Sequence, residues 1–90
     1  LTFDAPDEEA FPCFRLAKQA AQTGGTACAV LNGANETAVA HYLRGECGFY
    51  DIPRMVDHAL QTVPLAEADT LETVLQADRA ARAAADSWMR

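Results

Sequence analysis

A long run of apolar residues at helical spacing dominates the middle of this 90-residue chain. The run follows the Gly24-Gly25 pair and steps by three or four positions from Thr26 to about Leu43. Its apolar members are Ala27, Val30, Leu31, Ala34, Ala38 and Tyr42. Because this spacing keeps one face of a helix apolar, it predicts a single long helix that Thr26 caps. A break at the turn-favouring Asn32-Gly33 dipeptide is the alternative, although the apolar stripe passes through it in register.

Helical patterns on both sides of this run predict three further helices. Pro12 suits a first helical turn, and the apolar positions after it continue until Gly24-Gly25 allows a left-handed cap. Another stripe follows Asp51, a good N-cap residue, and ends at Pro64; its members are Ile52, Met55, Val56, Ala59, Leu60 and Val63. The last helix follows Asp69 or Thr70. Its buried face is expected to contain Leu71, Val74, Leu75, Ala81, Ala85 and Trp88.

Short connections between these helices predict an all-α fold, a four-helix bundle-like domain with an extended N-terminal lead-in. Residues 1–11 form the lead-in or linker in this prediction, with strand-like residues at its start, and residues 12–90 form the helical domain. Phe49 and Tyr50 are expected to plug one end of the bundle. Ninety residues are enough for one domain and no more.

The overall charge and the lengths of the apolar runs exclude some classes of partner. A net charge of −6 and scattered basic residues argue against nucleic acid, which needs clustered Lys and Arg. The uninterrupted apolar runs are only a few residues long, so no membrane span is expected. The chain begins at Leu1 rather than at a methionine, and we therefore expect a fragment, an excised domain or a processed product.

Cysteines and histidines give no signature of catalysis or metal binding. Cys13, Cys28 and Cys47 are odd in number and lack a C-x-x-C spacing. They are expected to be free thiols that act as small core hydrophobes in a reducing cytosol. His41 and His58 are expected to face solvent or lie at a helix edge rather than serve as a base or ligand.

Asn32, Asn35 and Glu36 form the one polar cluster that is expected to be half buried. As ligands they would offer one carboxylate and two neutral amides, a weak set for a divalent cation. The favoured interpretation is structural: these side chains bond to backbone groups at the end of a neighbouring helix or in a preceding domain. Asn35→Leu would then leave its partners unpaired.

Asp78 interrupts the apolar stripe of the last predicted helix. Arg82 lies four residues later, so an i,i+4 ion pair is the plain explanation. If Asp78 is buried it needs better partners, because a lone carboxylate is costly to desolvate. Asp78 and Arg82 complete the predicted set of structural polar residues, and no catalytic, cofactor-binding or metal-binding residue is predicted. The glycines follow no predicted strand, as a dinucleotide-binding loop would require.

Four segments in this order resemble one enzyme family. They are Phe11-Pro12-Cys13, the ten residues from Leu31 to Ala40, the six from Gly48 to Pro53, and the nine from Val74 to Arg82. The resemblance is to the C-terminal helical domain of 1-deoxy-D-xylulose 5-phosphate reductoisomerase, and it extends from about Leu1 to Arg82. Gly33 stands where this family usually has alanine, and Cys28 where proline or a small residue is common.

The resemblance implies a function for a parent enzyme rather than for this segment. The family uses NADPH and a divalent metal (Mg or Mn) to convert 1-deoxy-D-xylulose 5-phosphate to 2-C-methyl-D-erythritol 4-phosphate in the non-mevalonate isoprenoid pathway. NADPH binds an N-terminal domain, and metal and sugar phosphate bind a central one, at motifs with no matching position here. The implied role is architectural, packed on the preceding catalytic domains of a cytoplasmic, homodimeric bacterial parent. The alternative is a free-standing helical protein-interaction module.

Overall fold

The computed structural model describes residues 12–89, and these fold into four α-helices. The helices are α1 (Pro12–Thr23), α2 (Ala27–Leu43), α3 (Asp51–Thr62) and α4 (Leu71–Trp88). The predicted all-α, four-helix fold is confirmed. The predicted lead-in over residues 1–11 lies outside the described residues.

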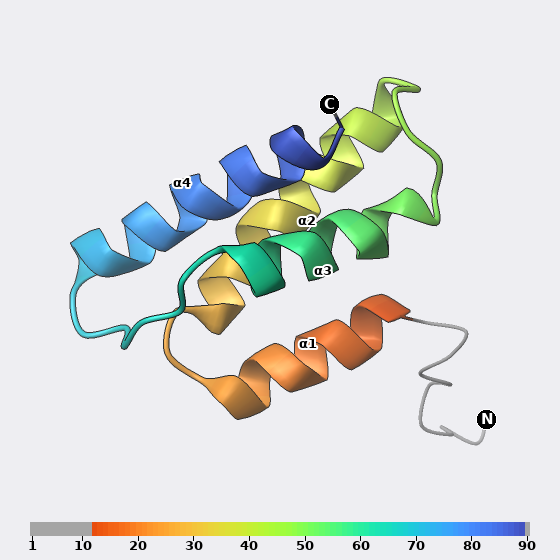
Figure 1. Cartoon of the computed structure of the whole chain (residues 1–90). Helices are drawn as coiled ribbons and strands as arrows, with labels where there is room; N and C mark the ends of the chain where they lie inside the picture. Colours follow the sequence, from red (N-terminus) through yellow and green to blue (C-terminus); the bar gives the residue numbers. More distant parts are fainter. Residues whose placement is uncertain (1–11, 90) are drawn as a thin grey trace, which may run out of the picture.

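The helices form a flattened bundle in which α1 occupies one edge (Figure 1). α2, α3 and α4 pack against one another, and α1 packs against α2 and α3. Contacts between α2 and α4 advance together along both helices, from Gly33 with Asp78 to His41 with Asp86, so these two helices run in the same direction. α3 and α1 run the opposite way (Figure 1).

The turn between α1 and α2 is fixed by glycine conformation and by a contact with a distant loop. Gly24 and Gly25 have φ of +75° and +59°, which confirms the predicted left-handed cap. Thr26 is buried, and its N–H donates to the carbonyl of Ala66 at 2.8 Å. The Thr26 hydroxyl accepts from the Ala66 N–H at 3.0 Å and makes no capping bond to α2. Thr26 thus occupies the predicted N-cap position, but its hydroxyl joins two loops instead of capping the helix.

α2 is unbroken across Gly33, which confirms the single long helix. α3 begins at Asp51 with Tyr50 in the N-cap position, and the Asp51 carboxylate accepts from the Gly48 N–H at 2.8 Å. Asp51 thus closes the turn before the helix rather than capping it. At the start of α4, the Thr70 hydroxyl accepts from the Thr73 N–H at 3.1 Å, so Thr70 is the cap.

Small residues dominate the core and let the helices approach closely. Its largest fully buried apolar side chains are Leu16, Val30, Met55 and Val56. The buried residues of α4 are all alanines, namely Ala77, Ala81 and Ala85. An alanine face permits short distances between helix axes, and close packing then replaces bulky side chains as the source of stability.

The predicted buried face of α4 is wrong at two positions. Leu71 is 74% exposed and Leu75 is 43% exposed. At 100° per residue, Leu75 lies about 120° around the helix from Ala81, the centre of the alanine face. A leucine on that face would hold α4 away from α2, so the helix turns its alanines inward and its leucines outward.

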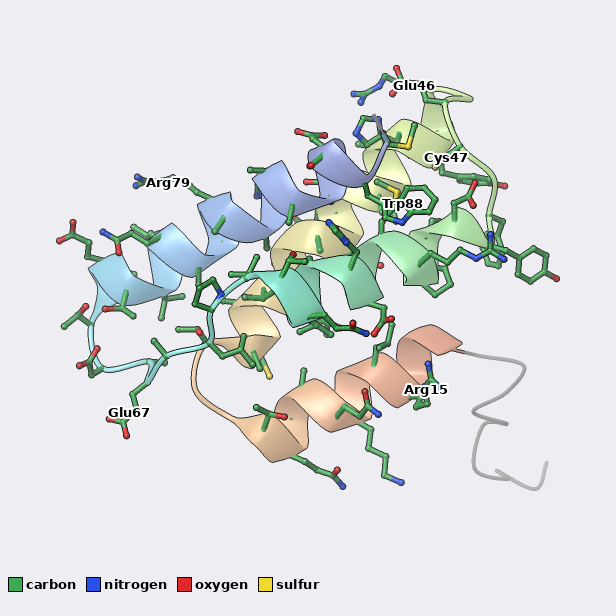
Figure 2. All side chains as sticks on the ribbon, viewed as in Figure 1. Arg15, Glu46, Cys47, Glu67, Arg79 and Trp88 are labelled. Atoms are coloured by element: carbon green, nitrogen blue, oxygen red, sulfur yellow. The ribbon has the colours of Figure 1, made fainter. Side chains whose placement is uncertain are left out.

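The aromatic residues at the end of α2 and the start of α3 do not plug the bundle, contrary to the prediction. Phe49 and Tyr50 are exposed. Their rings meet edge to face with centroids 5.7 Å apart, and Phe49 meets Tyr42 in the same way at 5.8 Å. Cys47 and Trp88 instead pack against the core at this end of the bundle (Figure 2).

Candidate functional site

Three of the five predicted polar residues meet at the outer edge of the contact between α2 and α4. Arg82 Nε donates to Asp78 Oδ2 at 2.9 Å, and another Arg82 nitrogen donates to Glu36 Oε2 at 2.6 Å. The i,i+4 pair predicted from the spacing is thus present, and Arg82 extends it across to α2. The Asp78 hydrogen bond, with the Glu36 bond second, raises the pKa of the Arg82 guanidinium, which stays charged in any case. We call Glu36, Asp78 and Arg82 the α2–α4 bridge.

Gly33 allows the close approach on which this bridge depends. A Cβ atom at position 33 would lie 2.6 Å from Asp78 Oδ1 and 2.9 Å from the Asp78 carbonyl oxygen. Side-chain oxygens can move aside, but the carbonyl belongs to the α4 backbone. Any larger residue would therefore push the two helices apart. This contact explains why α2 contains a glycine at position 33, although glycine lowers the helix propensity of a segment.

Asn32 and Asn35 do not belong to the bridge. Both are exposed, and neither side chain has a hydrogen-bond partner among residues 12–89. They line a shallow hollow of about 180 Å³ together with Ala17, Leu31 and Val56. The prediction of a half-buried amide cluster bonded to a neighbouring helix is wrong, because the outward side of α2 has no helix packed over it in the described part of the chain.

A second polar network lies where α2 and α4 end, and no pattern in the sequence indicates it. His41 is only 13% exposed in its side chain, and its two ring nitrogens meet the carboxylates of Asp86, at 2.6 Å, and of Glu46. Arg44 Nε also donates to Glu46, at 3.2 Å. Figure 2 shows Glu46 at this end of the bundle. His41 is thus at a helix edge but not solvent-facing, and its contact with Asp86, 45 residues away, could not be inferred from local spacing. His58 is half-buried.

Electrostatics in this network favour a protonated imidazole. Hydrogen bonding to Asp86, and next to Glu46, raises the pKa of His41 above its usual 6.5. His41, followed by Arg44, lowers the pKa of Glu46 below its usual 4.5. With a carboxylate oxygen at each nitrogen, both ring N–H groups can donate only in the charged form. When His41 is protonated, the network therefore holds the end of α4 to α2 through a cation.

The two described cysteines differ: Cys47 packs against the core, in line with the prediction, whereas Cys28 does not. Cys28 is exposed and Cys47 is half-buried, and both are free thiols. Burial raises the pKa of the Cys47 thiol, which keeps it protonated. The side chain of Cys13 lies outside the description.

The described residues contain no cluster of metal-ligating side chains. Within residues 12–89, no three His, Cys, Asp or Glu side chains are arranged to hold a metal ion. The same part of the chain contains no strand, so Gly24 and Gly25 connect two helices rather than a strand and a helix. No helix in it is long and apolar enough to cross a membrane. The Mg or Mn ion implied by the resemblance has no fitting site here.

Comparisons with known proteins agree on one family. The family model of the DXP reductoisomerase C-terminal domain matches residues 1–84. The 1-deoxy-D-xylulose 5-phosphate reductoisomerase of Xanthomonas oryzae pv. oryzae (strain PXO99A) is 58% identical over 82 residues, covering 91% of this chain and 21% of the relative. The enzyme of the same name from Ectopseudomonas mendocina (strain ymp) is 47% identical over 99% of this chain and 23% of its own length.

A solved structure also matches in three dimensions. It is the 1-deoxy-D-xylulose 5-phosphate reductoisomerase of Zymomonas mobilis in complex with NADPH, with a TM-score of 0.91 and 40% identity. The match covers 99% of this chain and 24% of that structure. The chain thus spans only about a fifth to a quarter of the length of these relatives.

Proposed function

The chain belongs to the family of DXP reductoisomerase C-terminal domains, and we propose that it is the architectural, non-catalytic part of such an enzyme. In this proposal, the parent converts 1-deoxy-D-xylulose 5-phosphate to 2-C-methyl-D-erythritol 4-phosphate with NADPH and a divalent metal. The names of the relatives support the activity, and the Zymomonas mobilis enzyme was solved with NADPH. The metal ligands and the NADPH site belong to the preceding domains.

The observation that best supports this architectural role is the α2–α4 bridge. Arg82 is satisfied by Asp78 and Glu36, so the charged residues at this site neutralise one another instead of pointing at a substrate. A catalytic carboxylate would need access to a reacting atom, whereas Asp78 faces the backbone of Gly33. Glu36, Asp78 and Arg82 accordingly have structural roles in this proposal, whereas Asn32 and Asn35 lie outside the bridge.

The resemblance further supports a homodimeric parent located in the cytoplasm. The net charge of −6 supports a domain that binds neither nucleic acid nor anionic lipid surfaces. Residues 1–11 would serve as the linker from the catalytic domains, and residues 12–90 as the helical domain.

Three proteins test the architectural role: the full-length parent, the parent without this domain, and the 90-residue chain alone. NADPH oxidation that depends on 1-deoxy-D-xylulose 5-phosphate and Mn²⁺ should be seen with the full-length parent and be absent with the chain alone. Deletion should lower the thermal stability of the catalytic domains. Turnover by the chain alone would refute the proposal.

Arg82→Gln in the parent separates a structural from a catalytic role for the bridge. It should lower the melting temperature while kcat at a temperature well below melting stays close to that of the parent. A large loss of kcat at unchanged stability would indicate a catalytic role instead. The free-standing module is the other outcome, and a reading frame that lacks the upstream domains would establish it.

A further inference from the structure

α2 differs from the other helices in the side chains that it turns outward. Its 17 residues contain one carboxylate, Glu36, and no Lys or Arg. α1, α3 and α4 instead expose basic residues such as Arg15, Arg54 and Arg79. Arg79 extends away from the bundle in Figure 2. These three helices look like solvated surface helices, and α2 does not.

The outward side of α2 is a continuous uncharged stripe. Cys28, Asn32, Asn35 and Leu43 are exposed, and Val39 is half-buried between the last two. Successive members of this stripe are three or four residues apart, which places them on one side of the helix. The opposite side carries the buried residues Ala27, Val30, Ala34 and Ala38. Glu36 borders the stripe and is neutralised by Arg82. A solvated surface helix typically carries charged residues on its outer side, and this side of α2 carries none except the paired Glu36 at its border.

The uncharged surface continues onto α4. Exposed Leu71 and Leu75 follow the same line along α4 as Asp78 and Arg82, at intervals of four, three and four residues. Asp78 and Arg82 contact α2 at Gly33 and Glu36, at the outer edge of the contact between the helices. The leucines therefore lie exposed along the edge of α4 that borders α2, near the start of both helices. We call the α2 stripe together with Leu71 and Leu75 the outer α2 face. In Figure 1, α2 runs behind α3 and α4.

The two amides indicate what chemistry this face accepts. Each amide can donate two hydrogen bonds and accept others, and neither finds a partner among residues 12–89. They lie over a hollow with an apolar floor made by Leu31, Val56 and Ala17. The apolar hollow suits an uncharged side chain of a partner segment. The two amides at the rim of the hollow suit unpaired backbone N–H and C=O groups of the same segment.

We propose that the outer α2 face is the docking surface for an uncharged segment of the preceding domains of the same polypeptide. Asn32 and Asn35 bond to the backbone of that segment. This inference rests on the proposed function, since it takes the remaining parent chain as the occupant. About four fifths of the length of the matched relatives lies outside this chain, so such a segment is available.

The size of the face favours a tethered partner over a second copy. A 17-residue helix is about 25 Å long and about 10 Å wide, so one side of it offers roughly 250 Å². A stable complex between separate proteins buries about 800 Å² per partner. A covalently linked neighbour does not need such an area, because the linker keeps it at a high effective concentration.

Thiol labelling of the full-length parent tests this proposal without relying on activity. Asn32→Cys places a thiol on the outer α2 face, and Gln76→Cys is the matched control, since Gln76 is an exposed amide beside Glu72 on the charged side of α4. A maleimide followed by peptide-resolved mass spectrometry gives the rate at each position. Position 32 should be labelled at least about tenfold more slowly than position 76 in the native parent, and equally fast in denaturant.

Equal rates at the two positions in the native parent would overturn the proposal, even if the parent is an active reductoisomerase. A short thiol-to-amine cross-linker attached to the thiol of Asn32→Cys identifies the occupant. A product with the mass of one chain, linked to a peptide upstream of this domain, is expected. A product with the mass of two chains would show that a second copy covers the face and would overturn the assignment of the occupant.

Discussion

Arg82 and His41 each hold two carboxylates, and they differ in their response to pH. Arg82 stays charged throughout, so the α2–α4 bridge does not lose its cation as pH rises. His41 loses its charge as pH rises through its raised pKa, and its partners Asp86 and Glu46 belong to α4 and to the loop after α2. The two networks therefore hold the same pair of helices under different conditions.

The His41 network should stabilise the chain most in mildly acidic solution. The folded-state pKa of His41 is raised above 6.5, so its contribution is complete below 6.5 and is lost as pH rises through the folded value. The folded-state pKa of Glu46 is lowered below 4.5, so its contribution is present above 4.5 and is lost as pH falls. The stabilising window lies between these values. Asp86 and Glu46 are about half-exposed, so solvent screening should keep the effect small.

His41→Gln measures this contribution. The free energy of unfolding should fall by more near pH 5.5 than near pH 8.5, because only the protonated imidazole donates to both carboxylates. Asp86→Asn is the companion variant and should show the same dependence on pH. A loss that is equal at the two pH values would mean that packing, not charge, explains the role of His41.

Among the elements, α4 shows how helix spacing selects the buried face. Its alanines Ala77, Ala81 and Ala85 lie in the core while Leu71 and Leu75 stay outside. Hydrophobicity alone ranks leucine above alanine for burial. The close contact between Asp78 and Gly33 leaves no room for a leucine between the helices, so the sterics of the approach decide the rotation of α4.

Two matched leucine truncations in the 90-residue chain test the orientation of α4. Leu16 is 1% exposed, and Leu16→Ala should cost about 2–5 kcal/mol of unfolding free energy. Leu75 is 43% exposed, and Leu75→Ala should cost less than about 1 kcal/mol, because much of its surface already meets water. Denaturant midpoints give both values. A cost for Leu75→Ala as large as for Leu16→Ala would place Leu75 in the core after all.

Across the whole molecule, the bundle divides into a closely packed trio and an edge helix. α2, α3 and α4 contact one another, and the α2–α4 bridge and the His41 network both lie within this trio. α1 sits against α2 and α3, and its fully buried described side chains are Leu16 and Ala20. The described side chains of α1, from Arg15 on, place fewer residues in the core than those of α2 or α3, so we expect α1 to need less free energy to separate from the bundle.

Amide hydrogen exchange should therefore show α1 as the first unit to open. Backbone amides at Leu16 and Ala20 should exchange faster than those at Val30 and Ala34, which lie in the middle of α2. The measurement needs native conditions and peptide or residue resolution. Equal protection in the two helices would show that the four helices open together as one cooperative unit.

The helices themselves could be predicted from the sequence, because local physics forms them. Glycines with positive φ end α1, the Thr70 hydroxyl starts α4, and α2 continues through Gly33 because its apolar stripe stays in register. The pairing of Asp78 with Arg82 followed from an i,i+4 spacing in the same way. Each of these features depends on residues within about one or two turns of chain.

Which faces meet could not be predicted, because it depends on the packed molecule. The exposure of Leu75, the exposed amides of Asn32 and Asn35 and the enclosure of His41 depend on how closely α4 approaches α2 and on which side of α2 another helix packs. The partners involved are up to 46 residues apart, as with Arg82 and Glu36. Periodicity reports that a helix has an apolar side but not its distance from its neighbour, and here a glycine opposite an aspartate sets that distance.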